Sequence, residues 1–182
     1  NVTLFHPEGL NIPALSDFAS RHGGDLPTTR EQLQSCGVEA ELLAREAVLY
    51  LDTDVLFLAA LEGQIHAGNA DKVKARVIVE GANAPLTGDA DRILGDAGVV
   101  IVPDILANAG GVIVSYLEWL QGREFHYYSE EEVFRLMYDK MKRTLDTLLP
   151  KYLSGIHSLR EWCYIQAVAR LSTVLYRQGK LF

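Results

Sequence analysis

The chain of 182 residues is 48% apolar and 23% charged, which is typical of a globular protein and excludes the disordered and collagen-like classes. Its net charge of −7 argues against a nucleic-acid partner, because such surfaces neutralise phosphates with lysine and arginine. No apolar stretch approaches the roughly 20 residues of a membrane span, so we expect no membrane partner.

The cysteines and histidines support two further expectations. Cys36 and Cys163 are too few for a disulfide framework, which indicates a reducing, cytoplasmic compartment. The five histidines show no metal-ligand spacing, so no metal site is expected.

The first third of the chain contains short elements. Residues 1–5 are expected to form a short strand or the exit from a strand. Residues 13–24 are expected to form a helix that begins at Pro13 and ends before Gly23 or Gly24. Residues 25–53 are acidic and irregular, which indicates short helical pieces at the surface.

Three short apolar runs follow, at residues 55–58, 77–79 and 99–102, and their first residues are 22 positions apart. Continuous runs of valine, isoleucine and leucine are typical of parallel strands that are buried on both faces. The segments between these runs contain helical or turn sequence and are expected to form short crossover connections. The sequence therefore predicts half of a doubly wound α/β sheet.

Long helices are predicted after the sheet. Residues 129–149 begin with Ser129 and Glu132, which have the spacing of a capping box, and apolar residues then recur at helical intervals. A last helix is expected over residues 157–178.

Small or polar residues follow each predicted strand. They are Ala59 and Ala60 after the first, Glu80, Gly81, Ala82 and Asn83 after the second, and Pro103, Asp104 and Asn108 after the third. Ligands of open parallel sheets bind beyond the carboxyl ends of the strands, where small side chains let a flat ligand approach. The alternative is that these residues only form tight turns between strands and helices.

The apolar segment 103–121 has an unusual entrance, because a helix built only for packing does not need Asn108, Gly110 and Gly111 there. The two glycines would let an anionic ligand approach the free N–H groups of the helix start. At about 100° per residue, one face carries Asn108, Val112, Ser115 and Trp119. A second stripe is expected to pack in the core: Ile113, Tyr116, Leu117 and Leu120. The alternative for Ser115 is a hydroxyl that bonds back to its own helix.

Two long segments carry a resemblance to a known family. VEGANAPLTGDAD (79–91) and VPDILANAGGVIVSYLEW (102–119) resemble the cofactor domain of glutamate dehydrogenases, within the glutamate/leucine/phenylalanine/valine dehydrogenase family. Three shorter segments fit the same family in the same order: HPEGLNIPAL (6–15), AALEGQI (59–65) and NADKVKAR (69–76). The ending SYLEW favours the glutamate enzymes over those acting on branched-chain or aromatic amino acids.

The resemblance implies a Rossmann-like, doubly wound, mostly parallel sheet that lacks its first strand and glycine-rich loop, with long C-terminal helices. It divides the chain into a partial dinucleotide-binding domain, residues 1–125, and a C-terminal helical segment, residues 126–182, that packs on it and towards a hinge. It also implies a homo-oligomer, a hexamer in the full-length family.

The implied activity is that of an oxidoreductase: NAD- or NADP-dependent, reversible oxidative deamination of L-glutamate to 2-oxoglutarate and ammonia. By this resemblance, Ala59 and Ala60 lie near the adenosine of the cofactor, and Gly81, Ala82 and Asn83 line the nicotinamide-side ribose. Asn108 holds the nicotinamide carboxamide and lies beside the substrate, whose pocket Val112 and Ser115 shape. Ser115 would donate to the side-chain carboxylate of glutamate.

The sequence departs from the family pattern at several points. The glycine-rich phosphate loop and the family's catalytic lysine and aspartate do not occur in this span, so we expect the chain alone to be inactive. Ala84 stands where glycine is common in the family, and Leu58 where proline is common. Two alternatives remain open: a noncatalytic regulatory paralogue that senses nucleotides or amino acids, and a related leucine or phenylalanine dehydrogenase.

Overall fold

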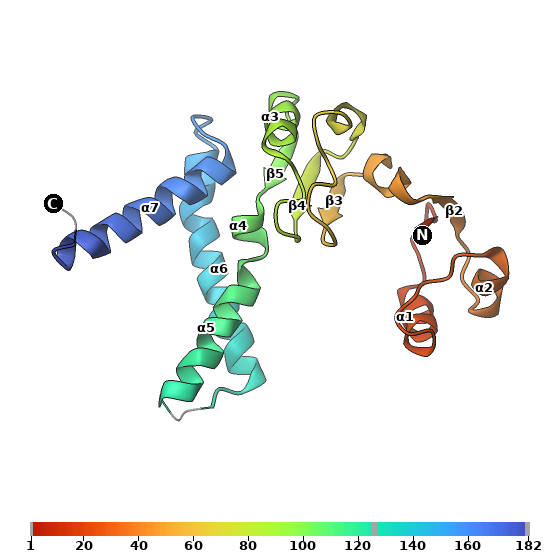
Figure 1. Ribbon diagram of the computed structural model, residues 1–182, viewed down its shortest axis with the longest axis horizontal. Coiled ribbons are helices and arrows are strands. Elements are labelled where there is room, and N and C mark those ends of the chain that lie inside the picture. Colours follow the sequence, from red (N-terminus) through yellow and green to blue (C-terminus); the bar gives the residue numbers. More distant parts are fainter. Residues whose placement is uncertain (1, 125–126, 181–182) are drawn as a thin grey trace. The chain divides into compact units, whose positions relative to one another are not determined.

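The computed structural model describes residues 2–124 and 127–180, and these residues form two compact units, Asn1–Asp52 and Thr53–Phe182 (Figure 1). The predicted boundary between residues 1–125 and 126–182 falls on residues outside the described ranges and stays a prediction. In the described parts of the chain, no helix is both long and apolar enough to cross a membrane.

The first unit contains a two-stranded antiparallel sheet and short helices. Strand β1 (Val2–Phe5) pairs with β2 (Glu41–Ala44). The helices are α1 (Ile12–Arg21), α2 (Arg30–Ser35) and the 3-10 helix η1 (Arg45–Tyr50). Of the two predictions for residues 1–5, the short strand is confirmed at residues 2–5, and the helix near residues 13–24 is confirmed as well.

Positive φ angles at Gly23 (+66°) and Gly24 (+96°) follow the end of α1, as the glycines predicted. The prediction for residues 25–53 was incomplete, because this segment contains strand β2 as well as helical pieces. The β2 sequence, Glu-Leu-Leu-Ala, has no β-branched residue and no strand signal of its own. This segment is a strand because it pairs with β1, which lies about 40 residues earlier in the chain. The local sequence gives no indication of such a distant partner.

The second unit contains a parallel three-stranded sheet in the order β3-β4-β5 (Figure 1). Its strands are β3 (Val55–Leu58), β4 (Val77–Glu80) and β5 (Val100–Val102), which confirms the three apolar runs as strands. Val55 pairs with Val77, and Val77 pairs with Val100. The crossovers contain the 3-10 helix η2 (Ala70–Lys72) and the helix α3 (Gly88–Asp96).

Burial on both faces was predicted for all three strands; this is wrong for β3, and in β5 all three residues are only half-buried. Ile78 in the middle strand is fully buried, whereas Val55 and Phe57 of β3 are 40% and 68% exposed. Val55 and Phe57 alternate with the buried Leu56 and Leu58 along β3, so they share one face of the sheet, and the described residues do not cover that face at β3.

Four helices follow the sheet: α4 (Asp104–Ala107), α5 (Ala109–Glu124), α6 (Glu130–Tyr152) and α7 (Leu159–Arg177). The predicted capping box is confirmed, because the Ser129 hydroxyl accepts from the Glu132 N–H and the Glu132 carboxylate accepts from the Ser129 N–H. Ser158 and Glu161 start α7 in the same way. One core cluster joins α4, α6 and α7: Leu106, Leu148, Leu159 and Cys163, packed against Val102, Tyr152 and Trp162.

Candidate functional site

The exits of β3 and β4 lie against each other. The Ala82 N–H donates to the Leu58 carbonyl (2.7 Å), and a Cβ added to Gly81 would lie 3.1 Å from the Ala59 Cβ. Ala59, Ala60 and Gly81 are exposed. The chain therefore offers a small, open backbone surface at this edge, where a side chain on residue 81 would crowd its neighbour.

The exit of β4 also meets the junction of α4 and α5. The Asn108 Nδ2 donates to the Asn83 Oδ1 (2.7 Å), which joins residues 25 positions apart. Asn108 is the residue at which α4 ends and after which α5 begins. The structure thus brings five of the predicted cofactor residues to one edge: Ala59, Gly81, Ala82, Asn83 and Asn108. Ala60 follows the first of them in the chain.

Val112 and Ser115 lie on α5, beyond Asn108, and are exposed; Val112 is 74% exposed. In the described residues the Ser115 hydroxyl makes no bond back to its own helix, unlike Thr144 and Thr147 on α6. Their exposure leaves both side chains accessible to a ligand. It does not test their assigned roles.

The predicted core stripe of α5 is only partly correct. Leu117 is buried, but Tyr116 is 47% exposed, and its ring lies 5.2 Å from the Lys140 ammonium. α5 packs beside α6 rather than inside a closed core, so part of the stripe remains at the surface (Figure 1).

The two glycines at the start of α5 have different environments. A Cβ on Gly110 would lie 3.1 Å from the Met137 Sδ of α6, so the lack of a side chain there permits close helix packing. Gly111 has no atom within 4 Å of such a position. The expectation that both glycines open the helix start to a ligand is therefore wrong for Gly110, which lies against α6.

A buried ionic cluster lies directly behind this edge. Glu80, the last residue of β4, is fully buried. The Arg160 Nη2 donates to both of its carboxylate oxygens (2.8 and 2.7 Å). The same guanidinium contacts Asp104 through Nη1 (2.9 Å) and Asp91 through Nε (2.5 Å). One cation from α7 thus contacts three carboxylates from β4, α3 and α4.

Asp104 connects this cluster to the loop after β4. Its backbone N–H donates to the Glu80 Oε2 (2.7 Å), and its own Oδ2 accepts from the Ala84 N–H (2.9 Å). Ala84 has a φ of +44°, the one positive φ at a non-glycine among the described residues. The loop therefore holds a conformation that alanine rarely adopts, next to Asn83.

In this cluster the pKa of each charged group depends on its charged neighbours. Burial raises the pKa of Glu80 above its ordinary value, although hydrogen bonds from Arg160 and the Asp104 N–H oppose this. Burial also acts to raise the pKa of Asp104, but the N–H groups of Ala84 and Ile105, together with Arg160, outweigh it and lower that pKa. Burial acts to lower the pKa of Arg160, but its bonds to Glu80 and Asp91 raise it, so the guanidinium stays charged.

Sequence reasoning missed this cluster, although it named Glu80 and Asp104 among the residues that follow the strands. One signal was available: Glu80 ends an apolar strand, and a carboxylate in such a place needs a cationic partner. Nothing in the sequence identifies Arg160, 80 residues away, as that partner.

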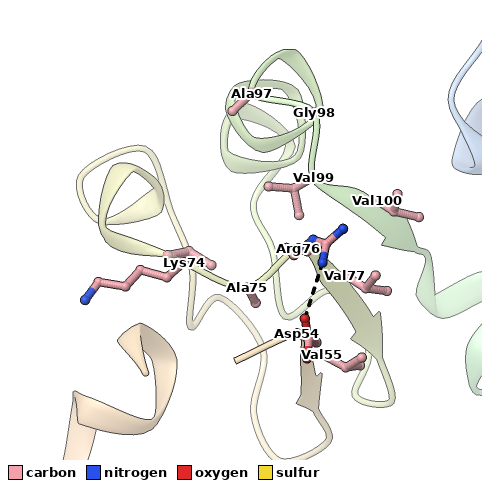
Figure 2. A pocket seen from close by; sticks show the side chains of 11 residues that line it. Asp54, Val55, Lys74, Ala75, Arg76, Val77, Ala97, Gly98, Val99 and Val100 are labelled. Carbon is pink, nitrogen blue, oxygen red and sulfur yellow. Dashed lines mark hydrogen bonds and ion pairs between the residues drawn. The ribbon is translucent and has the colours of Figure 1, made fainter. Parts of the chain in front are cut away.

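A cavity of about 520 Å³ lies at the opposite, amino-terminal edge of the sheet (Figure 2). Arg76 and Asp54 approach each other there (3.5 Å), and both are exposed. None of the predicted site residues lines this cavity. Because ligands of open parallel sheets bind at the carboxyl edge, we place the candidate site at Asn83 and Asn108.

Comparison with known proteins gives consistent results. The sequence pattern of the family described as Glutamate/Leucine/Phenylalanine/Valine dehydrogenase matches residues 1–179. The chain is 39% identical to an NADP-specific glutamate dehydrogenase of Synechocystis and 35% identical to an NAD-specific glutamate dehydrogenase of Staphylococcus aureus. Each match covers 97% of this chain, but only 41% and 40% of the relative.

A solved structure agrees. The chain is similar to the hetero-hexameric glutamate dehydrogenase of Thermus thermophilus in its Leu-bound form, with a TM-score of 0.81 and 31% identity. The match covers 96% of this chain and 39% of that one. The chain therefore spans about 40% of the length of the relatives that it matches.

Proposed function

Because the chain belongs to the glutamate/leucine/phenylalanine/valine dehydrogenase family, we propose that it forms the cofactor-binding part of an NAD- or NADP-dependent glutamate dehydrogenase. The reaction is the reversible oxidative deamination of L-glutamate to 2-oxoglutarate and ammonia. The observation that carries the proposal is the amide pair Asn83–Asn108 at the carboxyl edge of a parallel sheet, beside exposed small residues.

The cofactor supplies the hydride acceptor, and the residues of this chain bind and orient it. Ala59 and Ala60 face the adenosine, while Gly81, Ala82 and Asn83 face the nicotinamide-side ribose. These assignments fit the local chemistry, because the surface is exposed and carries no bulky side chain between the strands. A Cβ at residue 81 would reduce the space for the cofactor next to Ala59.

Asn108 holds the nicotinamide carboxamide. One of its two Nδ2 hydrogens is donated to Asn83, so its side-chain oxygen can accept from a ligand amide and its second Nδ2 hydrogen can donate to the ligand carbonyl. The fixed amide orientation gives the nicotinamide ring one preferred face, as hydride transfer requires.

Val112 and Ser115 form one wall of the substrate pocket on the next turns of α5. The Ser115 hydroxyl donates to the side-chain carboxylate of glutamate, and the exposed Val112 packs against the aliphatic part of the substrate. Both side chains are accessible on the described surface, which supports this role.

We further propose that the protein is a homo-oligomer, a hexamer, and is cytoplasmic. A hexameric relative supports the assembly, although that relative is a hetero-hexamer. The chain has two cysteines, Cys36 and Cys163, too few for a disulfide framework, which supports a reducing compartment. The division into a dinucleotide-binding domain, residues 1–125, and a helical segment, residues 126–182, is part of the same proposal.

The test is an assay of the full-length protein that carries this sequence. With 2-oxoglutarate and ammonia, we expect oxidation of NADH or NADPH, each assayed separately by its absorbance. The 2-oxo acids of leucine and phenylalanine serve as competing substrates, and turnover of these in preference to 2-oxoglutarate would identify the related dehydrogenases. Nucleotide binding by calorimetry without any turnover would instead identify a regulatory paralogue.

Variants at the two edges of the sheet add a control. Asn108→Ala should weaken cofactor binding and lower turnover. Arg76→Ala, at the amino-terminal cavity of Figure 2, should change neither. Ser115→Ala should reduce the preference for 2-oxoglutarate over apolar 2-oxo acids. Unchanged glutamate turnover in that variant would contradict the role of Ser115.

A further inference from the structure

Arg160 links helix α7 by hydrogen bonds to the carboxyl edge of the parallel sheet, where the candidate cofactor site lies. It lies in the first turn of α7, far from that edge in sequence. Its side chain is 23% exposed, and its guanidinium bonds Glu80, Asp91 and Asp104 at the same time. An arginine can do this because its planar guanidinium presents five N–H donors, whereas a lysine ammonium is a point charge on a flexible stem.

The bonds continue from Arg160 to the loop after β4. Glu80 and Asp104 are held both by Arg160 and by each other, through the Asp104 N–H. Asp104 then accepts from the Ala84 N–H, which fixes the loop in its positive-φ conformation. The next residue back, Asn83, accepts from Asn108. A short series of hydrogen bonds thus ends at the proposed carboxamide-binding group.

We propose that Arg160 is a positioning residue: through Glu80 and Asp104 it holds the loop of residues 81–84, and so the Asn83–Asn108 amide pair, in the geometry that binds the dinucleotide. The inference rests on the proposed function. Arg160 touches neither cofactor nor substrate and acts only through these carboxylates.

Asp91 and Asp104 make a matched pair for a test. Both side chains are 21% exposed, and both bond Arg160. Asp104 also binds the loop through the Ala84 N–H, whereas Asp91 belongs to α3 and makes no bond to residues 81–84. A purely structural cluster would respond alike to Asp91→Asn and Asp104→Asn. A positioning cluster would not.

The experiment measures two quantities on the full-length protein: the Kd for NADH or NADPH, and the hydrogen-exchange protection of the Ala84 amide. We expect Arg160→Gln and Asp104→Asn to raise the cofactor Kd about tenfold and to remove the protection at Ala84. Asp91→Asn should raise the Kd by much less, and Arg160→Lys should lie between Arg160→Gln and the unaltered protein. Arg170→Gln, at an exposed position of the same helix, should change neither quantity.

Two outcomes would overturn the inference. Equal effects of Asp91→Asn and Asp104→Asn on the Kd would reduce the cluster to a structural role. Lost protection at Ala84 with an unchanged Kd would show that the loop does not govern binding. If the unaltered protein binds neither nucleotide, the proposed function fails, and the Ala84 exchange still decides whether Arg160 holds the loop.

Discussion

At the scale of single residues, Ala84 combines an unfavourable backbone with a favourable contact. Its φ of +44° lies in the left-handed region, where the Cβ of an L-amino acid crowds the following carbonyl oxygen. Its N–H is nevertheless bonded to Asp104, so the surrounding contacts maintain the conformation. Glycine, which has no Cβ, would adopt it without the steric cost.

Ala84→Gly should therefore raise the free energy of unfolding by roughly 0.5–1 kcal/mol, as measured by urea denaturation. The matched control is Ala82→Gly in the same loop, where φ is not positive. That variant should lower the free energy of unfolding by about 0.4–1 kcal/mol, because glycine gives the unfolded chain more conformational freedom. A loss of stability in both variants would mean that Ala84 bears no strain.

At the scale of elements, helix α5 combines a packing contact and an open surface on adjacent residues. Gly110 lies against Met137 of α6, and Gly111 lies against nothing within 4 Å. Glycine inside a helix costs about 0.5–1 kcal/mol relative to alanine, so an unconstrained glycine needs some other reason to be there. Access for a ligand to the start of α5 is such a reason.

Gly111→Ala should stabilise the folded protein by up to about 1 kcal/mol. Gly110→Ala should stabilise it less or destabilise it, because the Met137 side chain has to move away from a Cβ at 3.1 Å. If a ligand approaches α5 at Gly111, the stabilised Gly111→Ala protein should also bind its nucleotide or substrate more weakly. Calorimetric binding and urea denaturation of both variants check this; higher stability with unaltered binding would contradict ligand access.

The elements of the fold were largely predictable, because their signals are local. The apolar runs at residues 55–58, 77–79 and 99–102 form the parallel strands, and Ser129 with Glu132 marks the start of α6. The common edge of Ala59, Gly81, Asn83 and Asn108 follows from the rule that parallel strands end on one side. Strand β2 was missed because it depends on its partner β1, and its own sequence carries no signal.

At the scale of the whole second unit, the contacts that fix the site join distant parts of the chain. Arg160 and Glu80 are 80 residues apart, and no spacing rule connects them. A buried carboxylate implies some cation, but only the packed structure selects which one. The contact between Gly110 and Met137 of α6 likewise joins residues that are distant in sequence. The sequence alone therefore led to the prediction that Gly110 leaves room for a ligand.

The ion pair also makes stability depend on pH once it is broken. Burial raises the pKa of Glu80, and Arg160 is the main group that opposes this rise. In Arg160→Met, the Glu80 carboxylate stays buried without a cation, so its folded-state pKa should rise further above its unfolded value near 4.5. Removing one partner of a buried pair typically costs about 3–5 kcal/mol, which we expect for this variant at neutral pH.

The sign of the pH effect follows from linkage. A carboxyl group with a raised folded-state pKa binds a proton on folding, so the loss in Arg160→Met should be smallest below about pH 4.5 and should grow as the pH rises through the folded-state pKa. Adding Glu80→Gln to Arg160→Met should recover part of the lost stability at neutral pH and remove most of this pH dependence. Urea denaturation from pH 4 to 8, referred at each pH to the unaltered protein, measures both. A loss that is independent of pH in Arg160→Met, or a double variant no more stable than the single one, would mean that Glu80 is not the buried charge that Arg160 compensates.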